Sequence, residues 1–223
     1  MKICLFDIDG TLLSSGGAGK AALESAFTED FGVALRHHIP YSGRTDRAIM
    51  RDLFRLHDLE DTPARVEKLL AGYLLRLPNS LNVRDGRVLP GILGLLDWMR
   101  TAGTYSIGLL TGNVRAGAKV KLGHYGLFEH FKFGGFGDNH FDRDDVAREA
   151  LAVIREEIDS VVSADQIWVI GDTPLDVQCA RAIGARVAAV ATGMHSVEQL
   201  AASKPDIVLA DLSDPSPLID CWR

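Results

Sequence analysis

The first predicted strand of this chain ends in two aspartates. Residues Ile3–Phe6 form a short run of large apolar side chains, which predicts a buried strand. Asp7-Ile8-Asp9-Gly10-Thr11 follows directly, and the two-residue period of an extended chain places Asp7 and Asp9 on one side. Two carboxylates this close repel each other when buried, so a proton or a cation has to neutralise them. The chain must therefore adopt a fold that forms a site where its first strand ends.

The aspartate pair suits phosphate chemistry. One carboxylate can act as nucleophile and the other as general acid and base, with Mg²⁺ between them and a phosphate. Gly10 and Thr11 also fit a tight loop that offers amides and a hydroxyl to an anion. The alternative is a polar turn that caps an edge strand, and this reading gives the two carboxylates no role.

Further apolar runs alternate with amphipathic segments along the chain. The candidate strands are Ser106–Leu110, Phe131–Gly134, Ile167–Ile170, Val187–Ala191 and Ile207–Leu209. Alternation of strands and helices predicts an α/β fold in which helices cover both faces of a parallel sheet. Such sheets bind ligands at the carboxyl ends of their strands, where Asp7, Thr111 and Asp172 stand.

The segment of residues 15–85 interrupts this alternation. It lacks convincing strands, and its apolar residues recur at helical spacing, with Thr62 and Pro63 suited to begin one of the helices. An insertion of this length after a first strand is usually a lid or a functional subdomain. We expect an α/β core of residues 1–14 and 86–223 and a helical domain of residues 15–85. The glycine-rich stretch from Ser14 to Gly19 is a candidate hinge.

Net charge, hydropathy and cysteine content limit the classes of partner and the compartment that we expect for this chain. The 223 residues carry a net charge of −6, which argues against a nucleic-acid partner. No apolar run reaches the length of a membrane span, and the first strand begins at once, without room for a signal peptide. Cys4, Cys179 and Cys221 have no metal-ligand spacing and indicate free thiols in a reducing compartment. We expect a cytoplasmic protein with a small-molecule partner, and its oligomeric state stays open.

Three motifs, in this order, resemble those of the haloacid dehalogenase superfamily. Asp7–Thr11 resembles the first motif, Leu109–Asn113 the second, and Ile170–Asp176 the fourth. Each motif alone is modestly specific, but each of the three closes an apolar run and together they span nearly the whole chain. The chain is most similar to phosphoglycolate phosphatase-like members with a helical cap. This resemblance implies a Rossmann-like parallel sheet flanked by helices, an inserted cap domain, and a Mg²⁺-dependent phosphatase.

The resemblance also implies roles for the aspartates. Asp7 would attack phosphorus and form an aspartyl-phosphate, and Asp9 would protonate the leaving alcohol and then activate water. Dehalogenases of the superfamily lack the second aspartate, so Asp9 favours phosphate chemistry. Asp172 would complete the Mg²⁺ site with Asp7 and the backbone carbonyl of Asp9. Asp176, one turn into the next helix, would orient a metal-bound water or a cation, unless it only complements the helix dipole.

Thr111 ends a candidate strand and is followed by Gly112 and Asn113. We interpret these residues as the start of a helix, where a hydroxyl and backbone amides form a phosphate site. The alternative is an ordinary N-cap threonine.

The third motif departs from the family pattern, which usually supplies a lysine shortly before the fourth motif. No lysine occurs between Lys132 and Lys204. Arg143 is our candidate replacement, because a guanidinium can hold the nucleophile's charge and bind phosphate bidentately. Lys119 or Lys121 could reach in from the helix after Thr111, but we expect both to lie about two turns along it, which is far. The alternative for Arg143 is a solvated side chain.

The segment Ser42-Gly43-Arg44-Thr45-Asp46-Arg47 lies in the predicted helical cap. Related caps carry a similar stretch facing the cleft, and Arg44 or Arg47 would suit a carboxylate or a second phosphate of the substrate. Alternatively, both arginines are solvated at a helix start.

The leading hypothesis is a Mg²⁺-dependent phosphatase for a small phosphomonoester such as phosphoglycolate. One alternative is a phosphosugar mutase, although the segment from Ser14 to Leu23 lacks the histidine that such relatives carry. The other alternative is a non-catalytic binding protein on the same fold, which the missing lysine would favour.

Overall fold

The computed structural model describes residues 1–222 and contains a six-stranded parallel sheet in the order β5-β4-β1-β6-β7-β8. Its strands are β1 (Lys2–Phe6), β4 (Tyr105–Leu110), β5 (Phe133–Gly135), β6 (Ile167–Gly171), β7 (Arg186–Val190) and β8 (Ile207–Leu209). The strand order reverses at β1, because β4 and β5 lie on one side of it and β6, β7 and β8 on the other. Ligands of parallel sheets bind at such a reversal.

Helices cover both faces of the sheet. They are α4 (Ile92–Ala102), α5 (Arg115–His124), α6 (Arg143–Val153), α7 (Pro174–Ala182), α8 (Val197–Ala202) and α9 (Ser216–Trp222). Three short helical turns complete this part of the chain, namely η1 (Phe128–His130), η2 (Ile154–Ile158) and η3 (Ala164–Gln166).

The two faces of the sheet bury alternate residues of the central strands. Ile3 and Leu5 pack in the cluster that contains the buried residues of α6, α7 and α8. Cys4 and Phe6 pack in the cluster of α4, α5 and α9. This alternation follows from the two-residue period of a strand, and it explains why β1 reads as an uninterrupted apolar run.

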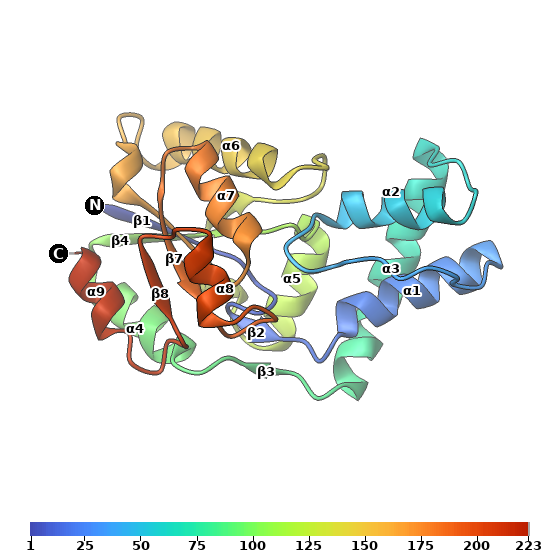
Figure 1. Ribbon diagram of the computed structural model, residues 1–223, viewed down its shortest axis with the longest axis horizontal. Helices are drawn as coiled ribbons and strands as arrows, with labels where there is room; N and C mark the ends of the chain where they lie inside the picture. Colours follow the sequence, from blue (N-terminus) through green and yellow to red (C-terminus); the bar gives the residue numbers. More distant parts are fainter. Residues whose placement is uncertain (223) are drawn as a thin grey trace.

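Three further helices, α1 (Ala18–Phe31), α2 (Asp46–Leu56) and α3 (Pro63–Val83), form a bundle beside the sheet (Figure 1). They pack around their own apolar cluster, which includes Phe27, Phe54 and Leu69. The chain enters and leaves this bundle through two short strands, β2 (Leu13–Ser14) and β3 (Arg87–Val88), which pair antiparallel. The two chain ends lie at the opposite end of the molecule from the bundle (Figure 1).

The predicted fold class is confirmed, and the expected strands lie within two residues of those observed. Thr62 caps α3 and Pro63 is its first residue, as the sequence indicates. The ribbon of β2 and β3 was not predicted, because two-residue strands carry no detectable periodicity. Within residues 1–222, no helix combines the length and the apolar character that crossing a membrane requires.

Candidate active site

The loop after β1 forms the floor of a cavity of about 440 Å³ between the sheet and the helical bundle. Asp7, Asp9 and Gly10 line it from this loop, and Asp172 lines it from the loop after β6. The backbone amide of Asp7 donates to the carbonyl of Ile170 in β6, which holds the start of the loop after β1 against the strand that precedes Asp172. The aspartates after β1 and β6 therefore lie together at one edge of the sheet, as the sequence predicts.

Asp7 and Asp172 form a buried acidic cluster with Asp176, and oxygens of the three carboxylates lie within 4.8 Å of one another. Burial raises the pKa of Asp7 to about 6, against the lowering effect of the Arg143 charge. Burial and the charges of Asp176 and Asp7 raise the pKa of Asp172 to about 8. A cation placed among these oxygens would favour the ionised carboxylates, because it would offset both the burial and the mutual repulsion that raise these pKa values.

Two glycines press against the Asp172 carboxylate. Gly10 has φ +88°, and a Cβ atom at Gly10 or at Gly193 would overlap the carboxylate oxygens of Asp172. The Thr11 hydroxyl donates to Asp172 Oδ1 at 3.1 Å. Glycine at both positions leaves room for the Asp172 carboxylate, and Asp172 lines the cavity.

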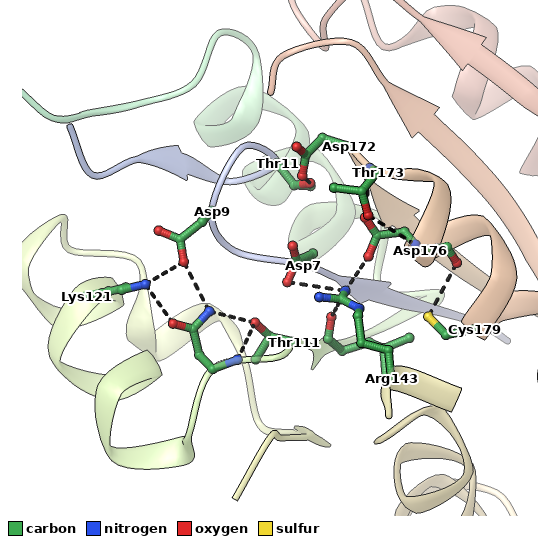
Figure 2. A network of polar contacts seen from close by, with 12 residues as sticks. Asp7, Asp9, Thr11, Thr111, Lys121, Arg143, Asp172, Thr173, Asp176 and Cys179 are labelled. Carbon is green, nitrogen blue, oxygen red and sulfur yellow. Dashed lines mark hydrogen bonds and ion pairs between the residues drawn. The ribbon is translucent and has the colours of Figure 1, made fainter. Parts of the chain in front are cut away.

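Arg143 is buried at the first position of α6 and joins three elements (Figure 2). Its guanidinium forms an ion pair with Asp176, lies 3.5 Å from Asp7 Oδ1, and donates to the Leu110 carbonyl at 3.3 Å. The solvated alternative for Arg143 is wrong, because its side chain is only 5% exposed. The structure places Arg143 beside Asp7, as the sequence analysis expects.

Asp176 does not line the cavity. One of its oxygens pairs with Arg143, and the other accepts from the backbone amide and the hydroxyl of Thr173 at 2.9 and 2.7 Å. Asp176 therefore combines the two predicted possibilities, since it caps α7 and holds a cation.

A second network surrounds Asp9 (Figure 2). The Lys121 ammonium donates to Asp9 Oδ2 at 2.5 Å and to Asn113 Oδ1 at 2.6 Å. Asn113 Nδ2 donates to Asp9 at 3.1 Å, and the Ser15 hydroxyl donates to the other Asp9 oxygen at 3.1 Å. Burial raises the pKa of Asp9, but the charge and hydrogen bond of Lys121 prevail, so the pKa is lowered overall. Burial alone would lower the pKa of Lys121. The charges of Asp9 and Asp46 outweigh this effect, so the pKa of Lys121 is raised overall.

The expectation that Lys121 lies too far from the site is wrong. Helix α5 begins at Arg115, so Lys121 is on its second turn, and its side chain turns inward with that of Ala118. Lys119 is exposed on the other side of α5, where its ammonium lies 5.6 Å from the Phe128 ring centre. The available signal was a lysine at helical spacing with Ala118 and next to Leu122, on the buried stripe of α5.

Thr111 does not begin a helix, in contrast to our interpretation. Residues 111–114 form a loop, in which the Thr111 hydroxyl accepts from the backbone and side-chain nitrogens of Asn113 at 3.3 and 2.9 Å. Gly112 and Asn113 line the cavity beside Asp7 and Asp9, whereas the backbone of Thr111 is buried behind them. The Thr111 side chain also acts to lower the pKa of Asp7, against the larger effect of burial.

The two cap arginines differ in position. Arg44 lines the cavity, but its guanidinium pairs with Asp52 at 2.6 Å and donates to the Pro40 carbonyl. Arg47 is not part of the cavity wall, and its guanidinium lies 5.7 Å from the ring centre of Phe141. The structure thus gives no substrate-facing position to Arg47, because its place on α2 turns it toward the loop before α6.

Asp46, between these arginines, was not predicted as a site residue. Its carboxylate accepts from the backbone amide of Val114 at 2.8 Å, and its own amide donates to the Gly112 carbonyl at 2.8 Å. The first residue of α2 is thereby bound to the loop that carries Asn113. Burial raises the pKa of Asp46 to about 6, and the Lys121 charge opposes this.

Comparison with known proteins agrees with the site. A family model described as haloacid dehalogenase-like hydrolase matches residues 4–190. The chain belongs to the haloacid dehalogenase-like hydrolases. A phosphoglycolate phosphatase of Rhodospirillum rubrum is 30% identical over 203 residues, which cover 86% of this chain and 80% of the relative. A phosphoglycolate phosphatase of Synechococcus elongatus is 27% identical, with 96% and 95% of the two chains covered.

The fold of this haloacid dehalogenase-like hydrolase also matches solved structures. The crystal structure of a predicted phosphoglycolate phosphatase from Haemophilus somnus 129PT superimposes with a TM-score of 0.76, at 18% identity and 98% coverage of both chains. The family resemblance and the prediction of a hydrolase of the phosphatase type are thereby confirmed.

Proposed function

We propose that this chain is a Mg²⁺-dependent phosphatase that hydrolyses a small phosphomonoester through an aspartyl-phosphate at Asp7. The observation that carries the proposal is the placement of Asp7 at the cavity floor, between Arg143 and Asp172, with Asp9 facing the same cavity. Phosphoryl transfer depends mainly on positioning and charge neutralisation, and both are present here. Phosphoglycolate, named for two of the relatives, is one candidate substrate.

The donor set suits Mg²⁺. Asp7, Asp172 and the backbone carbonyl of Asp9 would supply hard oxygen ligands, which Mg²⁺ prefers. The Oδ1 atom of Asp7 is buried and accepts no hydrogen bond, and burial together with the charges of Asp176 and Asp7 raises the pKa of Asp172 despite its hydrogen bond from Thr11. When bound, Mg²⁺ would neutralise the carboxylates and draw charge from a phosphoryl oxygen.

Asp7 would attack phosphorus with one carboxylate oxygen. The new bond joins that oxygen to phosphorus, while the bond from phosphorus to the ester oxygen breaks. Asp9 would give a proton to the departing alkoxide, and it would then take a proton from the water that attacks the aspartyl-phosphate. That attack releases inorganic phosphate and restores the Asp7 carboxylate.

Asp9 has to carry a proton for the first of these steps. Lys121 holds the Asp9 carboxylate ionised in the arrangement without substrate, since it lowers the pKa of Asp9. We infer that the Lys121 ammonium passes from Asp9 to a phosphoryl oxygen when the ester binds. Loss of this ion pair would raise the pKa of Asp9 and allow it to bind the proton that it later donates.

Arg143 and Lys121 would together supply the positive charge of the missing third-motif lysine. Arg143 is fixed by Asp176 and faces Asp7, and Lys121 is fixed by Asn113 and faces Asp9. Thr111 and the backbone of Gly112 and Asn113 would complete the phosphate site. Helices α1, α2 and α3 would act as the cap that encloses the substrate, with residues 15–85 as a domain of its own.

The experiment is a phosphate-release assay with the purified protein. We expect hydrolysis of a generic aryl phosphate with Mg²⁺, loss of turnover after exhaustive chelation, and inhibition by Ca²⁺, which prefers more ligands at longer distances. A mutase would instead yield an isomerised sugar phosphate. Within residues 1–222, no histidine lines the cavity, so the structure adds no support for that alternative. Absence of any turnover would favour a binding protein.

A further inference from the structure

The cavity extends well beyond the space beside Asp7. Its volume of about 440 Å³ lies within the range of sites that bind whole small molecules, and it is large for a two-carbon alcohol. On the side of the helical bundle, its wall includes apolar and aromatic side chains from α1, α2, α3 and the segment between α1 and α2. These residues are Leu23, Tyr41, Ile49 and Tyr73, and the exposed Met194 lines the cavity from the loop after β7.

The positive charges in the cavity wall are already paired. At the phosphate end, Lys121 contacts Asp9, and Arg143 contacts both Asp7 and Asp176. A bound phosphoryl group and metal would change these ion pairs. Lys121 and Arg143 would then bind the phosphoryl end of the substrate and not its alcohol portion.

The cavity wall on the side of the helical bundle contains two cations. Arg44 is bound to Asp52 at 2.6 Å and to a backbone carbonyl. The ammonium of Lys20 lies 3.9 Å from Glu24, and the same carboxylate accepts from the Tyr41 hydroxyl at 3.4 Å. Among residues 1–222, the cavity therefore offers no cation without a carboxylate partner to a second anionic group of the substrate.

Asp46 makes the same part of the cavity less favourable for a second anionic group of the substrate. Asp46 lines the cavity on the bundle side, and its carboxylate accepts a hydrogen bond from the backbone amide of Val114 at 2.8 Å. A substrate carboxylate or a second phosphate that entered this part of the cavity would approach a like charge. Repulsive groups of this kind are a common means of rejecting a near-cognate ligand.

We propose, on the basis of the phosphatase function above, that the alcohol portion of the substrate is uncharged and carries an apolar or aromatic group. Such a group would be buried against Leu23, Ile49 and Tyr73 while the phosphoryl group lies beside Asp7. The chemical class is a phosphomonoester of a bulky neutral alcohol. Of the candidate substrates of the phosphatase function, this proposal disfavours phosphoglycolate, because its alcohol portion carries a carboxylate.

Two matched pairs of esters test this proposal. Benzyl phosphate and 4-carboxybenzyl phosphate differ by one carboxylate, as do ethyl phosphate and phosphoglycolate, and all four release an alkyl alcohol. We expect the uncharged member of each pair to have a kcat/KM at least about tenfold higher than the charged one. We also expect benzyl phosphate to exceed ethyl phosphate by about tenfold or more.

Substitutions of Met194 test whether the selection against charged alcohols takes place in this cavity. Its side chain is 83% exposed at the mouth of the cavity, so the fold tolerates replacement. We expect Met194→Lys to raise the ratio of kcat/KM for 4-carboxybenzyl over benzyl phosphate at least about fivefold, because it supplies the missing cation. Met194→Gln, the matched polar control, should leave this ratio within about twofold of the wild-type value.

The outcomes separate this proposal from the phosphatase function. Faster turnover of phosphoglycolate than of ethyl phosphate, or equal turnover within each pair, would overturn the proposal and leave the phosphatase function intact. Hydrolysis of none of these esters, and none of a generic aryl phosphate with Mg²⁺, would overturn both. A preference for benzyl phosphate together with the Met194→Lys response would support the proposal.

Discussion

The ammonium of Lys121 lies 2.5 Å from Asp9 Oδ2, although 112 residues separate the two in the sequence. This ion pair is one half of a divided arrangement, because Arg143 faces the neighbouring Asp7 at 3.5 Å. Each aspartate of the first motif thus has its own cation. Both charge pairs lie at the end of the cavity where the proposed phosphoryl transfer takes place.

Replacement of Lys121 should be far more costly than replacement of its exposed neighbour. We predict that Lys121→Met lowers kcat by roughly a hundredfold, since a fixed charge in a water-poor site can contribute on the order of 3 kcal/mol. Lys119→Met, on the same helix, should leave kcat within about twofold because solvent screens its charge. Steady-state kinetics at saturating Mg²⁺ and substrate measure both. Equal losses in the two variants would remove Lys121 from the site.

Arg143 should contribute to stability as well as to activity. We predict that Arg143→Ala lowers the free energy of unfolding by about 3–5 kcal/mol, because it leaves the buried Asp176 carboxylate without its cation. Arg148 on the same helix pairs with Asp145 at the surface, so Arg148→Ala should cost less than about 1 kcal/mol. Urea unfolding followed by circular dichroism provides both values. A loss for Arg143→Ala as small as that of the control would contradict the buried pair.

The raised pKa of Asp46 predicts a pH-dependent stability. The folded protein holds a proton on Asp46 up to about pH 6, whereas the unfolded chain releases it near the ordinary value of 3.8. The folded state therefore binds more protons between these values, and the Asp46 contribution to stability falls as pH rises through this window.

Asp46→Asn should remove this dependence. We predict that the stability of Asp46→Asn relative to wild type increases by up to about 3 kcal/mol between pH 4 and pH 7, since two pKa units correspond to that energy. Urea unfolding of both proteins at several pH values measures this difference in the free energy of unfolding. Acidic groups far from Asp46 affect both proteins alike, so their contributions cancel. A constant difference, or one that decreases with pH, would show that Asp46 ionises freely.

The sequence predicted the sheet better than it predicted the site. The apolar runs that end at Phe6, Leu110 and Ile170 locate β1, β4 and β6, because a strand buried on both faces leaves a strong local signal. The convergence of Asp7 and Asp172 follows from parallel strands sharing one edge. This part of the site depends only on topology.

The remaining part depends on side-chain directions that the sequence does not encode locally. The error of four residues at the start of α5 placed Lys121 too far away, and its burial results from contact between separate elements. The position of Arg47 has the same cause, since α2 turns its side chain toward Phe141 and away from the cavity wall. Helix boundaries are the least certain part of a sequence-based prediction. When a helix start is misplaced, the predicted position of the charged end of a long side chain is wrong as well.

Mg²⁺ should stabilise the folded protein through Asp172. We predict that millimolar Mg²⁺ raises Tm of the wild-type protein by a few degrees, since a ligand that binds only the folded state shifts unfolding by mass action. Asp172→Asn should lose this shift while its metal-free form remains folded, because the substitution removes a charge whose burial is unfavourable. Differential scanning calorimetry with and without Mg²⁺ tests this independently of turnover. An undiminished shift in the variant would place the metal elsewhere.

The covalent role of Asp7 is the central claim, and chemical trapping tests it most directly. The protein is mixed with substrate and Mg²⁺, quenched in acid during turnover, and treated with borohydride, which reduces an aspartyl-phosphate to homoserine. Peptide mass spectrometry should find homoserine at position 7 in the wild-type protein. It should find none in Asp7→Asn, which lacks the nucleophilic carboxylate and should lose at least about a thousandfold in kcat while keeping its fold. Turnover without modification at position 7, or modification of another aspartate, would contradict the account.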